Sequence, residues 1–257
     1  MSGAYDAYMG RWSRRAATEF LDWLHVPSNC IWLDVGCGTG ALTEAVLAQC
    51  APKEILGVDP SEGFVANAAR SIEDSRATFR VGNAMSLPVD AGAYDAVVSG
   101  LVLNFVPDAK EGVAEMARAV RSGGSVAAYV WDYAGRMELM RWFWDVAIQL
   151  NPEASNRDEG KRQPMLCAPG PLTELFRDAG LANVQVRSID VVTRFADFDD
   201  YWTPFTGGQG SAPGYAMSLS DEARTTLRER LRADLPISEE GSITMIARAW
   251  TIMGQRE

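Results

Sequence analysis

The chain has 257 residues, with 24 Lys and Arg against 34 Asp and Glu, so its formal net charge is −10 with its single histidine neutral. Hydrophobic residues make up 47% and charged residues 23%, a globular composition that excludes a disordered chain. The negative charge disfavours nucleic acid and anionic membrane surfaces as partners, because no compact Lys/Arg run offsets it. We therefore expect a small-molecule partner, and a monomer or homodimer.

The cysteine and histidine counts argue against metal chemistry. The four cysteines form no C-x-x-C pair and the only histidine is His25, so we expect no metal site. His25 follows a helix-like run, where a solvent-facing or carbonyl-capping role is favoured over catalysis. The first residues lack the basic and apolar regions of a signal peptide, and no uncharged apolar run reaches the ~18 residues of a spanning helix. These features predict a cytoplasmic protein with reduced thiols and no membrane segment.

Short apolar runs alternate with helix-like segments in the first half of the chain. After an expected helix over Arg14–Leu24, the predicted strands are Cys30–Val35, Glu54–Val58, Thr78–Val81, Tyr94–Ser99 and Ser125–Trp131. The helices predicted between them are Ala41–Gln49, Ser61–Ile72 and Asp108–Val120. Strands and helices that alternate at this spacing predict βαβ units and a mostly parallel, doubly wound sheet.

The pattern changes after Trp131. Arg136–Leu150 is a predicted helix that is apolar on nearly every face, so it must be covered on several sides. Further helices are expected at Pro171–Ala179 and Asp221–Ala233, and strands at Val184–Phe195 and Ser242–Trp250, which can pair as an antiparallel hairpin around an inserted helical loop. The predicted fold class is therefore α/β, with a doubly wound, mostly parallel seven-stranded sheet and a helical cap built from insertions.

A glycine-rich turn joins the first predicted strand to the helix after it, where glycines permit a tight turn and close approach to a ligand. Gly36, Gly38 and Gly40 are spaced two apart and follow Asp34, whereas the dinucleotide fingerprint G-x-G-x-x-G spaces its last two glycines three apart. Asp59 closes the second strand, where a carboxylate can accept two hydrogen bonds from a ribose diol. A glycine-rich turn alone is weak evidence for a ligand site, and the acid after the second strand strengthens that evidence.

With these residues the sequence resembles the class I S-adenosylmethionine-dependent methyltransferases, and it is similar in particular to the ubiquinone/menaquinone-type small-molecule methyltransferases. The resemblance covers most of the chain and implies a Rossmann-like methyltransferase fold with S-adenosyl-L-methionine as cofactor. In that family the glycine loop surrounds the methionyl part of the cofactor and the acid after the second strand holds the ribose. The cofactor-binding residues that the resemblance implies are Tyr8, Arg11, Asp34, Gly36, Cys37, Gly38, Gly40, Asp59, Pro60, Ser61, Asn83, Ala84, Ser99 and Leu101.

The sequence differs from the family pattern at one position, and its N-terminal segment also resembles the family. Asn83 stands where the family usually has an aspartate, but an amide oxygen can still accept a hydrogen bond from the adenine amino group. The segment Tyr5–Arg14 looks like a lid over the cofactor, with Arg11 either paired to the cofactor carboxylate or exposed ahead of a core Trp12. Arg121–Gly124 resembles the turn before the fifth strand.

Methyl transfer from a sulfonium depends mostly on positioning the acceptor and excluding water. The sequence identifies no catalytic residue. An acceptor that must lose a proton needs a base, whereas an amine, thiol or electron-rich carbon does not. The candidates by location are Tyr8, Asn104, Asp132, Tyr133 and Tyr201.

Aromatic residues outside the sheet suggest a pocket for a flat or apolar acceptor. Trp12, Trp144 and Trp202 are the predicted substrate-pocket residues, with interior packing as the other interpretation, and Tyr201–Gly208 looks like an aromatic lid. We predict one methyltransferase domain over 1–257, with a core at about 28–131, 171–195 and 241–254 and a cap and lid at about 1–27, 132–170 and 196–240.

The predicted function is methyl transfer from S-adenosylmethionine to a small, aromatic or apolar organic acceptor at an unresolved O, N or C atom. Two rivals stay open. An NAD-dependent oxidoreductase would share the sheet and Asp59 but requires the other glycine spacing, and a non-catalytic S-adenosylmethionine-binding protein would keep the loop without turnover.

Overall fold

The computed structural model describes residues 11–162, 166–207 and 210–257, except for the side chains of Arg11 and Arg162. The chain divides into two compact units. The sheet unit contains residues 13–130, 166–189 and 250–257, and the helical unit contains residues 131–162, 190–207 and 210–249 with Arg11 and Trp12. The boundaries differ from the predicted core and cap, because most of the N-terminal helix belongs to the sheet unit. Whether the whole forms one domain stays a prediction.

A seven-stranded sheet in the order β3-β2-β1-β4-β5-β7-β6 confirms the predicted fold class. β1 pairs in parallel with β2 and β4, β2 with β3, and β4 with β5. The strand order reverses beside β1, so the carboxyl ends of β1 and β4 flank the position where this architecture binds ligands. The strands are β1 (Ile31–Val35), β2 (Glu54–Asp59), β3 (Ala77–Val81), β4 (Tyr94–Gly100), β5 (Val120–Trp131), β6 (Ala182–Phe195) and β7 (Ile243–Gln255).

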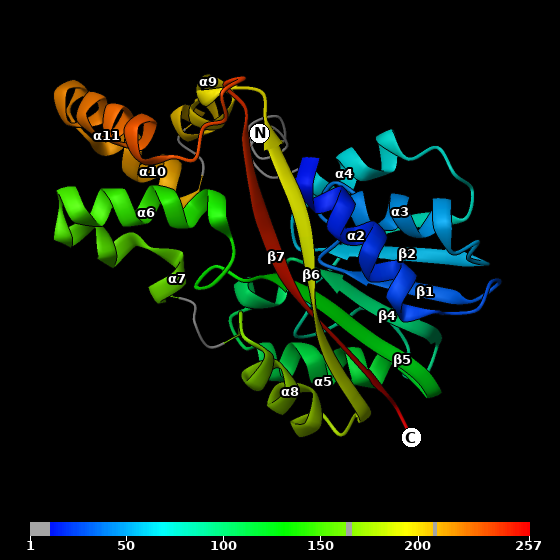
Figure 1. Cartoon of the computed structure of the whole chain (residues 1–257). Coiled ribbons are helices and arrows are strands. Elements are labelled where there is room, and N and C mark those ends of the chain that lie inside the picture. Colours follow the sequence, from blue (N-terminus) through cyan, green and yellow to red (C-terminus); the bar gives the residue numbers. More distant parts are fainter. Residues whose placement is uncertain (1–10, 163–165, 208–209) are drawn as a thin grey trace. The chain divides into compact units, whose positions relative to one another are not determined.

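The last two strands lie side by side as long antiparallel neighbours (Figure 1). Asn183 near the start of β6 donates to Gln255 at the end of β7 over 2.9 Å. Further along, Arg248 of β7 contacts both carboxylate oxygens of Asp190 at 2.6 and 2.7 Å. The partners' numbers run in opposite directions, so the predicted hairpin around an inserted helical segment is confirmed.

Two helices of the sheet unit, Glu62–Ser71 and Ala109–Ala119, begin directly after capping residues. The Ser61 hydroxyl accepts from the Phe64 backbone at 3.3 Å, and the Asp108 carboxylate accepts from the Glu111 backbone at 3.1 Å. α8 lies beside α5 (Figure 1), where an ion pair of 3.1 Å joins Asp178 to Lys110. The α-helices are α2 (Arg11–Leu24), α3 (Ala41–Gln49), α4 (Glu62–Ser71), α5 (Ala109–Ala119) and α8 (Pro169–Asp178), with a 3-10 turn at Leu103–Phe105.

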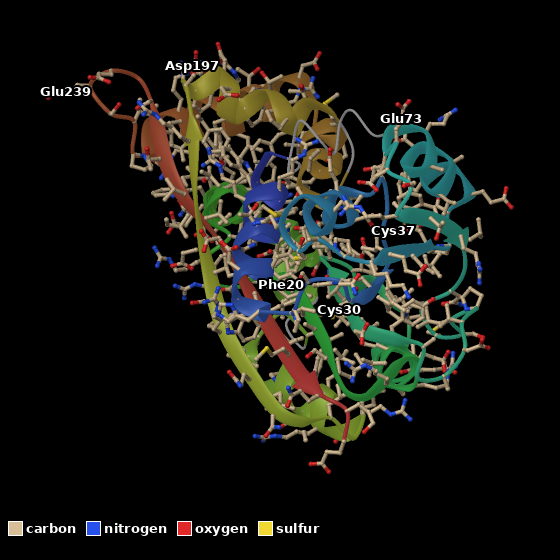
Figure 2. All side chains as sticks on the ribbon, turned by 90° about the vertical axis from the view of Figure 1, so that its right-hand side faces the viewer. Phe20, Cys30, Cys37, Glu73, Asp197 and Glu239 are labelled. Carbon is tan, nitrogen blue, oxygen red and sulfur yellow. The ribbon has the colours of Figure 1, made fainter. Side chains whose placement is uncertain are left out.

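Two features of the sheet unit differ from expectation or go beyond it. Phe20 of α2, labelled in Figure 2, packs on Tyr129 of β5 with ring centroids 4.8 Å apart, so the N-terminal helix contributes to the core. Arg121–Gly124 is not a turn ahead of the fifth strand. β5 already begins at Val120, and its register with β4 jumps from Val120 to Ser125, which makes the four residues a bulge inside the strand.

The helical unit has an aromatic core around α6, which confirms that this apolar helix is covered on several sides. Phe143 stacks on Phe205 with centroids 4.5 Å apart, and Trp144 contacts Tyr215 at 5.5 Å. The helices are α6 (Glu138–Leu150), α7 (Glu159–Arg162), α9 (Phe198–Trp202), α10 (Ser211–Ser218) and α11 (Asp221–Asp234), with 3-10 turns at Pro152–Arg157 and Thr203–Gly207. Within the described ranges no helix is long and apolar enough to cross a bilayer.

We expect Phe143→Ala to destabilise the protein by about 3–5 kcal/mol, because it removes a fully buried ring from this core. Leu150→Ala on the same helix is the matched control, since Leu150 is 44% exposed. Urea unfolding of both variants measures the difference, and equal losses of stability would contradict the assigned core.

Candidate cofactor and active site

The turn after β1 requires its glycines. Gly36, Gly38 and Gly40 have φ angles of +77°, +54° and +94°, in the left-handed region that favours glycine. The backbone N–H groups of Gly36 and Cys37 donate to the Val58 carbonyl at 2.7 and 3.1 Å. The loop is therefore hydrogen-bonded to the end of β2 and leads directly into α3.

Close packing at two of the glycines contrasts with open space at the third. A Cβ atom on Gly36 would lie 2.5 Å from the Val102 side chain, and one on Gly40 would lie 2.5 Å from Ile72. A Cβ on Gly38 would meet nothing within 4 Å. The middle of the loop is thus the place where a ligand can approach the backbone closely.

The Asp59 carboxylate joins the two loops that follow β1 and β2. Its Oδ2 accepts from the Gly38 backbone at 3.0 Å, and its Oδ1 accepts from the Ser61 backbone at 2.8 Å. A carboxylate has about four lone-pair positions, so two acceptor positions remain beyond these bonds. Asp59 can therefore hold the loops in place and still accept hydrogen bonds from a diol.

Asp34 is a buried acid at the start of the loop. Its side chain is only 1% exposed, and its Oδ2 accepts a hydrogen bond of 2.7 Å from the Thr43 hydroxyl of α3. Burial raises the pKa of Asp34 to about 7, with the Thr43 hydrogen bond opposing the shift and the nearby Asp59 charge adding to it. The sequence motif identified Asp34 but not Thr43. The Thr43 hydroxyl lies beside the acid because of the way α3 is rotated about its axis, which the motif does not indicate.

Cys37 and Ser99 have structural roles in this site. Burial, reinforced by Asp34 and Asp59, raises the pKa of the Cys37 thiol, so the thiol stays protonated at neutral pH and fills space. The Ser99 hydroxyl is fully buried and donates to the Val35 carbonyl at 2.8 Å, which joins β4 to β1. The contacts of Cys37 and Ser99 with a cofactor stay predictions.

The segment after β3 is a tight turn. The Asn83 side-chain oxygen accepts from the Met85 backbone at 3.0 Å, and Asn83 forms a β-bridge with Ser86. Ala84 lies within this turn, half-buried. The predicted adenine contact of Asn83 and the contacts of Ala84, Pro60 and Ser61 stay predictions.

The segment after β4 carries backbone strain and an exposed ring. Leu101 has a φ of +62°, which is rare for a residue with a side chain, and its N–H donates to the Tyr129 carbonyl at 2.8 Å. Leu103 is buried and anchors the 3-10 turn, whereas the Phe105 side chain is 63% exposed. Strain that the surroundings impose in this way is typical of functional segments.

The candidate catalytic residues are distributed over both units. Asn104 belongs to the sheet unit, and Asp132, Tyr133 and Tyr201 belong to the helical unit. The two carboxylate oxygens of Asp132 accept from the Gly135 and Arg136 backbones at 3.0 Å each, so this acid stabilises a turn. Tyr8 lies outside the described residues, as does the side chain of Arg11.

Tyr201 is fully buried, and its hydroxyl donates to the Leu139 carbonyl at 3.1 Å. Burial raises the pKa of Tyr201, which disfavours the phenolate that a base would need. Tyr201 and Phe205 thus pack inside the helical unit, and a role of their segment as an aromatic lid stays a prediction.

The three predicted substrate-pocket tryptophans are also buried within the helical unit. Trp12 packs edge-on against Phe195 with centroids 5.6 Å apart, and Trp202 stacks on Phe198 at 6.5 Å. The Trp144 indole N–H donates to Glu159 at 2.7 Å, a partner that sequence reasoning missed. Interior packing accounts for these contacts, and a substrate role for the tryptophans stays a prediction.

Known proteins match both the sequence and the fold. The model of a methyltransferase domain family matches residues 33–128. The demethylmenaquinone methyltransferase of Bacillus licheniformis is 33% identical over 201 residues, which cover 72% of this chain and 78% of that protein. The corresponding protein of Bacillus subtilis is 34% identical over 186 residues, 64% of this chain and 76% of its own length. The chain belongs to the class I S-adenosylmethionine-dependent methyltransferases.

Solved structures show the same fold. The YcgJ protein from Bacillus subtilis superposes with a TM-score of 0.62 and 20% identity, over 95% of this chain and 99% of that one. Haemonchus contortus phosphoethanolamine N-methyltransferase 2, in complex with S-adenosyl-L-methionine, has a TM-score of 0.62 and 14% identity over all of this chain and 57% of that one. The cofactor of the present methyltransferase is S-adenosylmethionine. The residues fit this ligand, because the Gly38 backbone has open space beside it and Asp59 has acceptor positions left for the ribose hydroxyls.

The raised pKa of Asp34 predicts a pH-dependent stability. Because its folded-state pKa lies above the unfolded value, folding binds a proton between about pH 4 and 7, and stability falls as the pH rises through this window. The amide of Asp34→Asn has no proton to lose. The free energy of unfolding of this variant, minus that of the wild type, should therefore increase by about 2–3 kcal/mol from pH 5 to pH 8. Urea unfolding without cofactor measures this, with the exposed Asp90→Asn as control. A variant-to-wild-type difference that does not change with pH would contradict the prediction.

We expect Asp59→Ala to weaken S-adenosylhomocysteine binding by about 1.5–3 kcal/mol, because it removes the charged acceptor that fixes Gly38. Asp178→Ala, which breaks an exposed ion pair on α8, is the matched control and should bind normally. Isothermal titration measures both dissociation constants. Unchanged affinity in Asp59→Ala would remove Asp59 from the site.

Proposed function

We propose that this methyltransferase methylates a small aromatic or apolar ring compound of the quinol type. The observation that carries the proposal is the exposed Phe105 ring in the strained segment after β4. The curated relatives described above are named for demethylmenaquinone, a quinone, and this supports an acceptor with a flat apolar ring.

We propose that the loop from Asp34 to Gly40 and the Asp59 carboxylate bind the cofactor, whose sulfonium supplies the methyl group. The left-handed glycines place backbone N–H groups along the loop, and Asp59 keeps the Gly38 N–H and the Ser61 N–H oriented. Both bonds are made within the chain, and a loop held by its own hydrogen bonds loses less conformational freedom on binding.

Apolar side chains are exposed where the parallel strands end. Phe105 follows β4, Phe64 lies in the first turn of α4, and Val81 ends β3, with exposed fractions of 63%, 42% and 44%. We propose that these exposed apolar side chains, at the edge of the sheet where this architecture binds ligands, cover bound molecules. We assign Phe105 to the acceptor because its segment follows β4, and Phe64 to the adenine side because it follows Asp59.

Proton removal from a quinol would require a base from the chain or water. Among the described candidates, Asp132 and Tyr201 have their side-chain polar atoms hydrogen-bonded to backbone groups. Asn104, one residue before Phe105 in the 3-10 turn, is the candidate best placed by sequence to orient an acceptor hydroxyl. Its amide can donate or accept a hydrogen bond but cannot act as a strong base.

An acceptor panel tests the proposal. Purified protein and S-adenosylmethionine are incubated with a naphthoquinol, a simple phenol, an aliphatic amine and phosphoethanolamine, and release of S-adenosylhomocysteine is followed. We expect turnover with the naphthoquinol. Turnover with phosphoethanolamine or the amine alone would contradict an apolar ring acceptor, and cofactor binding without turnover on any ring would favour the non-catalytic alternative.

Within the same assay, Phe105→Ala should raise the KM for the ring acceptor about tenfold, because a ring that packs on the acceptor is lost. Phe105→Tyr keeps the ring and is the matched variant, which should retain most of the activity. The dissociation constant of S-adenosylmethionine should not change in either variant. A KM that is unaffected by Phe105→Ala would remove this residue from the acceptor site.

A further inference from the structure

Three helices of the helical unit form a cavity whose lining lies entirely within that unit. α6, α10 and α11 lie side by side (Figure 1), and the cavity between them has a volume of about 350 Å³. Its apolar side chains include Ala147, Leu150, Leu219 and Leu227. Small-molecule sites have volumes of this order, with mostly apolar walls and a few polar groups that orient the ligand. The cavity is therefore large enough for a small organic ligand.

Tyr215 of α10 lines this cavity and has a hydroxyl without a partner. The residue is only 7% exposed, and its ring packs against Trp144 with centroids 5.5 Å apart and edge-on against Phe143 at 6.3 Å. Its hydroxyl forms no hydrogen bond with any residue that the structure describes. A buried phenol normally has a hydrogen-bond partner, so the hydroxyl indicates that a ligand in the cavity supplies one.

The electrostatics of the cavity favour a positive charge. α6 ends at Leu150 and α10 at Ser218, and neither helix has a basic residue in its last turn to balance the partial negative charge of its carbonyl end. Among the described residues of the lining, Glu222 alone is charged. Its carboxylate is exposed and forms no ion pair within the described chain. A ligand with a cationic group would complement all three features.

The arginines near the cavity already have carboxylate partners. Arg224 donates to the Leu219 carbonyl at 3.3 Å and forms an ion pair with Asp221, and Arg230 pairs with Asp234 at 2.6 Å. Neither arginine is among the described lining residues. The positive N-terminus of α11 is balanced by two acids in its first turn. These charges therefore leave the preference for a cation in place.

We propose that this cavity binds a small apolar ammonium compound, whose hydrocarbon part packs on Leu150 and Leu227 and whose ammonium group donates to the Glu222 carboxylate and the Tyr215 hydroxyl oxygen. An ammonium group has three N–H donors and no acceptor, which suits these two acceptors. The apolar part gains from the side chains that the three helices leave uncovered. The site is independent of the proposed cofactor loop and of the methyl acceptor.

Three probes that share one ring test the charge preference by isothermal titration of the full chain at pH 7. 2-Phenylethylamine is cationic at this pH, 2-phenylethanol is neutral and 3-phenylpropionate is anionic. We expect the amine to bind with a dissociation constant of about 1 mM or below. The alcohol should bind about threefold more weakly, since an exposed ion pair contributes little, and the anion more weakly still. Failure of the amine to bind, or equal binding of either other probe, would overturn the proposal.

Two variants test the polar contacts. Tyr215→Phe removes only a hydroxyl that has no partner in the described chain, so the fold should persist and the affinity for 2-phenylethylamine should fall about fivefold. Glu222→Gln should lower it about threefold and abolish the preference for the amine over the alcohol. Glu239→Gln, at an exposed loop acid (Figure 2), is the matched control and should bind like the wild type. Unchanged affinity in Tyr215→Phe or Glu222→Gln would overturn the contact assigned to that residue.

Ala223→Leu tests the location of the site. Ala223 lines the cavity and is half-buried on α11, so a larger side chain there fills part of the cavity without removing a polar group. Leucine is nearly as good a helix former as alanine, so the helix should be kept. Binding of 2-phenylethylamine should be lost, whereas binding of S-adenosylhomocysteine should not change. An Ala223→Leu protein that is folded by thermal melting and binds the amine with wild-type affinity would overturn the proposed site.

Discussion

The bridge that Asp59 makes between the Gly38 and Ser61 backbone groups is the interaction on which the site depends. It connects the loop after β1 to the start of α4, and both loops follow neighbouring parallel strands. The other hydrogen bonds that hold the left-handed glycine loop among the described residues go to the Val58 carbonyl or lie within the turn. A single carboxylate therefore fixes the backbone donors and presents its remaining lone pairs at the same edge of the sheet.

The two units have different kinds of polar and aromatic chemistry. In the sheet unit, buried acids stand beside an open backbone loop, and apolar rings are exposed at the strand ends. In the helical unit the rings pack on each other, and three of its acids have partners within the unit: Asp132 accepts from backbone groups, Asp158 from Arg141 and Glu159 from Trp144.

Sequence reasoning predicted the parallel strands and the loop acids because both depend on local patterns: short apolar runs, capping residues and glycine spacing. It could not find the Thr43 contact, since the phase of a helix relative to a strand is a tertiary property. Trp144 shows a second limit. An aromatic residue in an apolar helix has the same sequence signature in a core as in a pocket, and its partner Glu159 lies in a polar stretch without a motif.

The contact between Gly36 and Val102 has a consequence for protein engineering. Any side chain at position 36 would collide with Val102, which lies in the segment that we assign to the acceptor. The glycine loop and the segment after β4 are therefore in direct contact, so a change of size in one displaces the other. Enlarging residue 102 to change acceptor preference would push directly on the glycine loop, so such designs should alter positions 103–105 first.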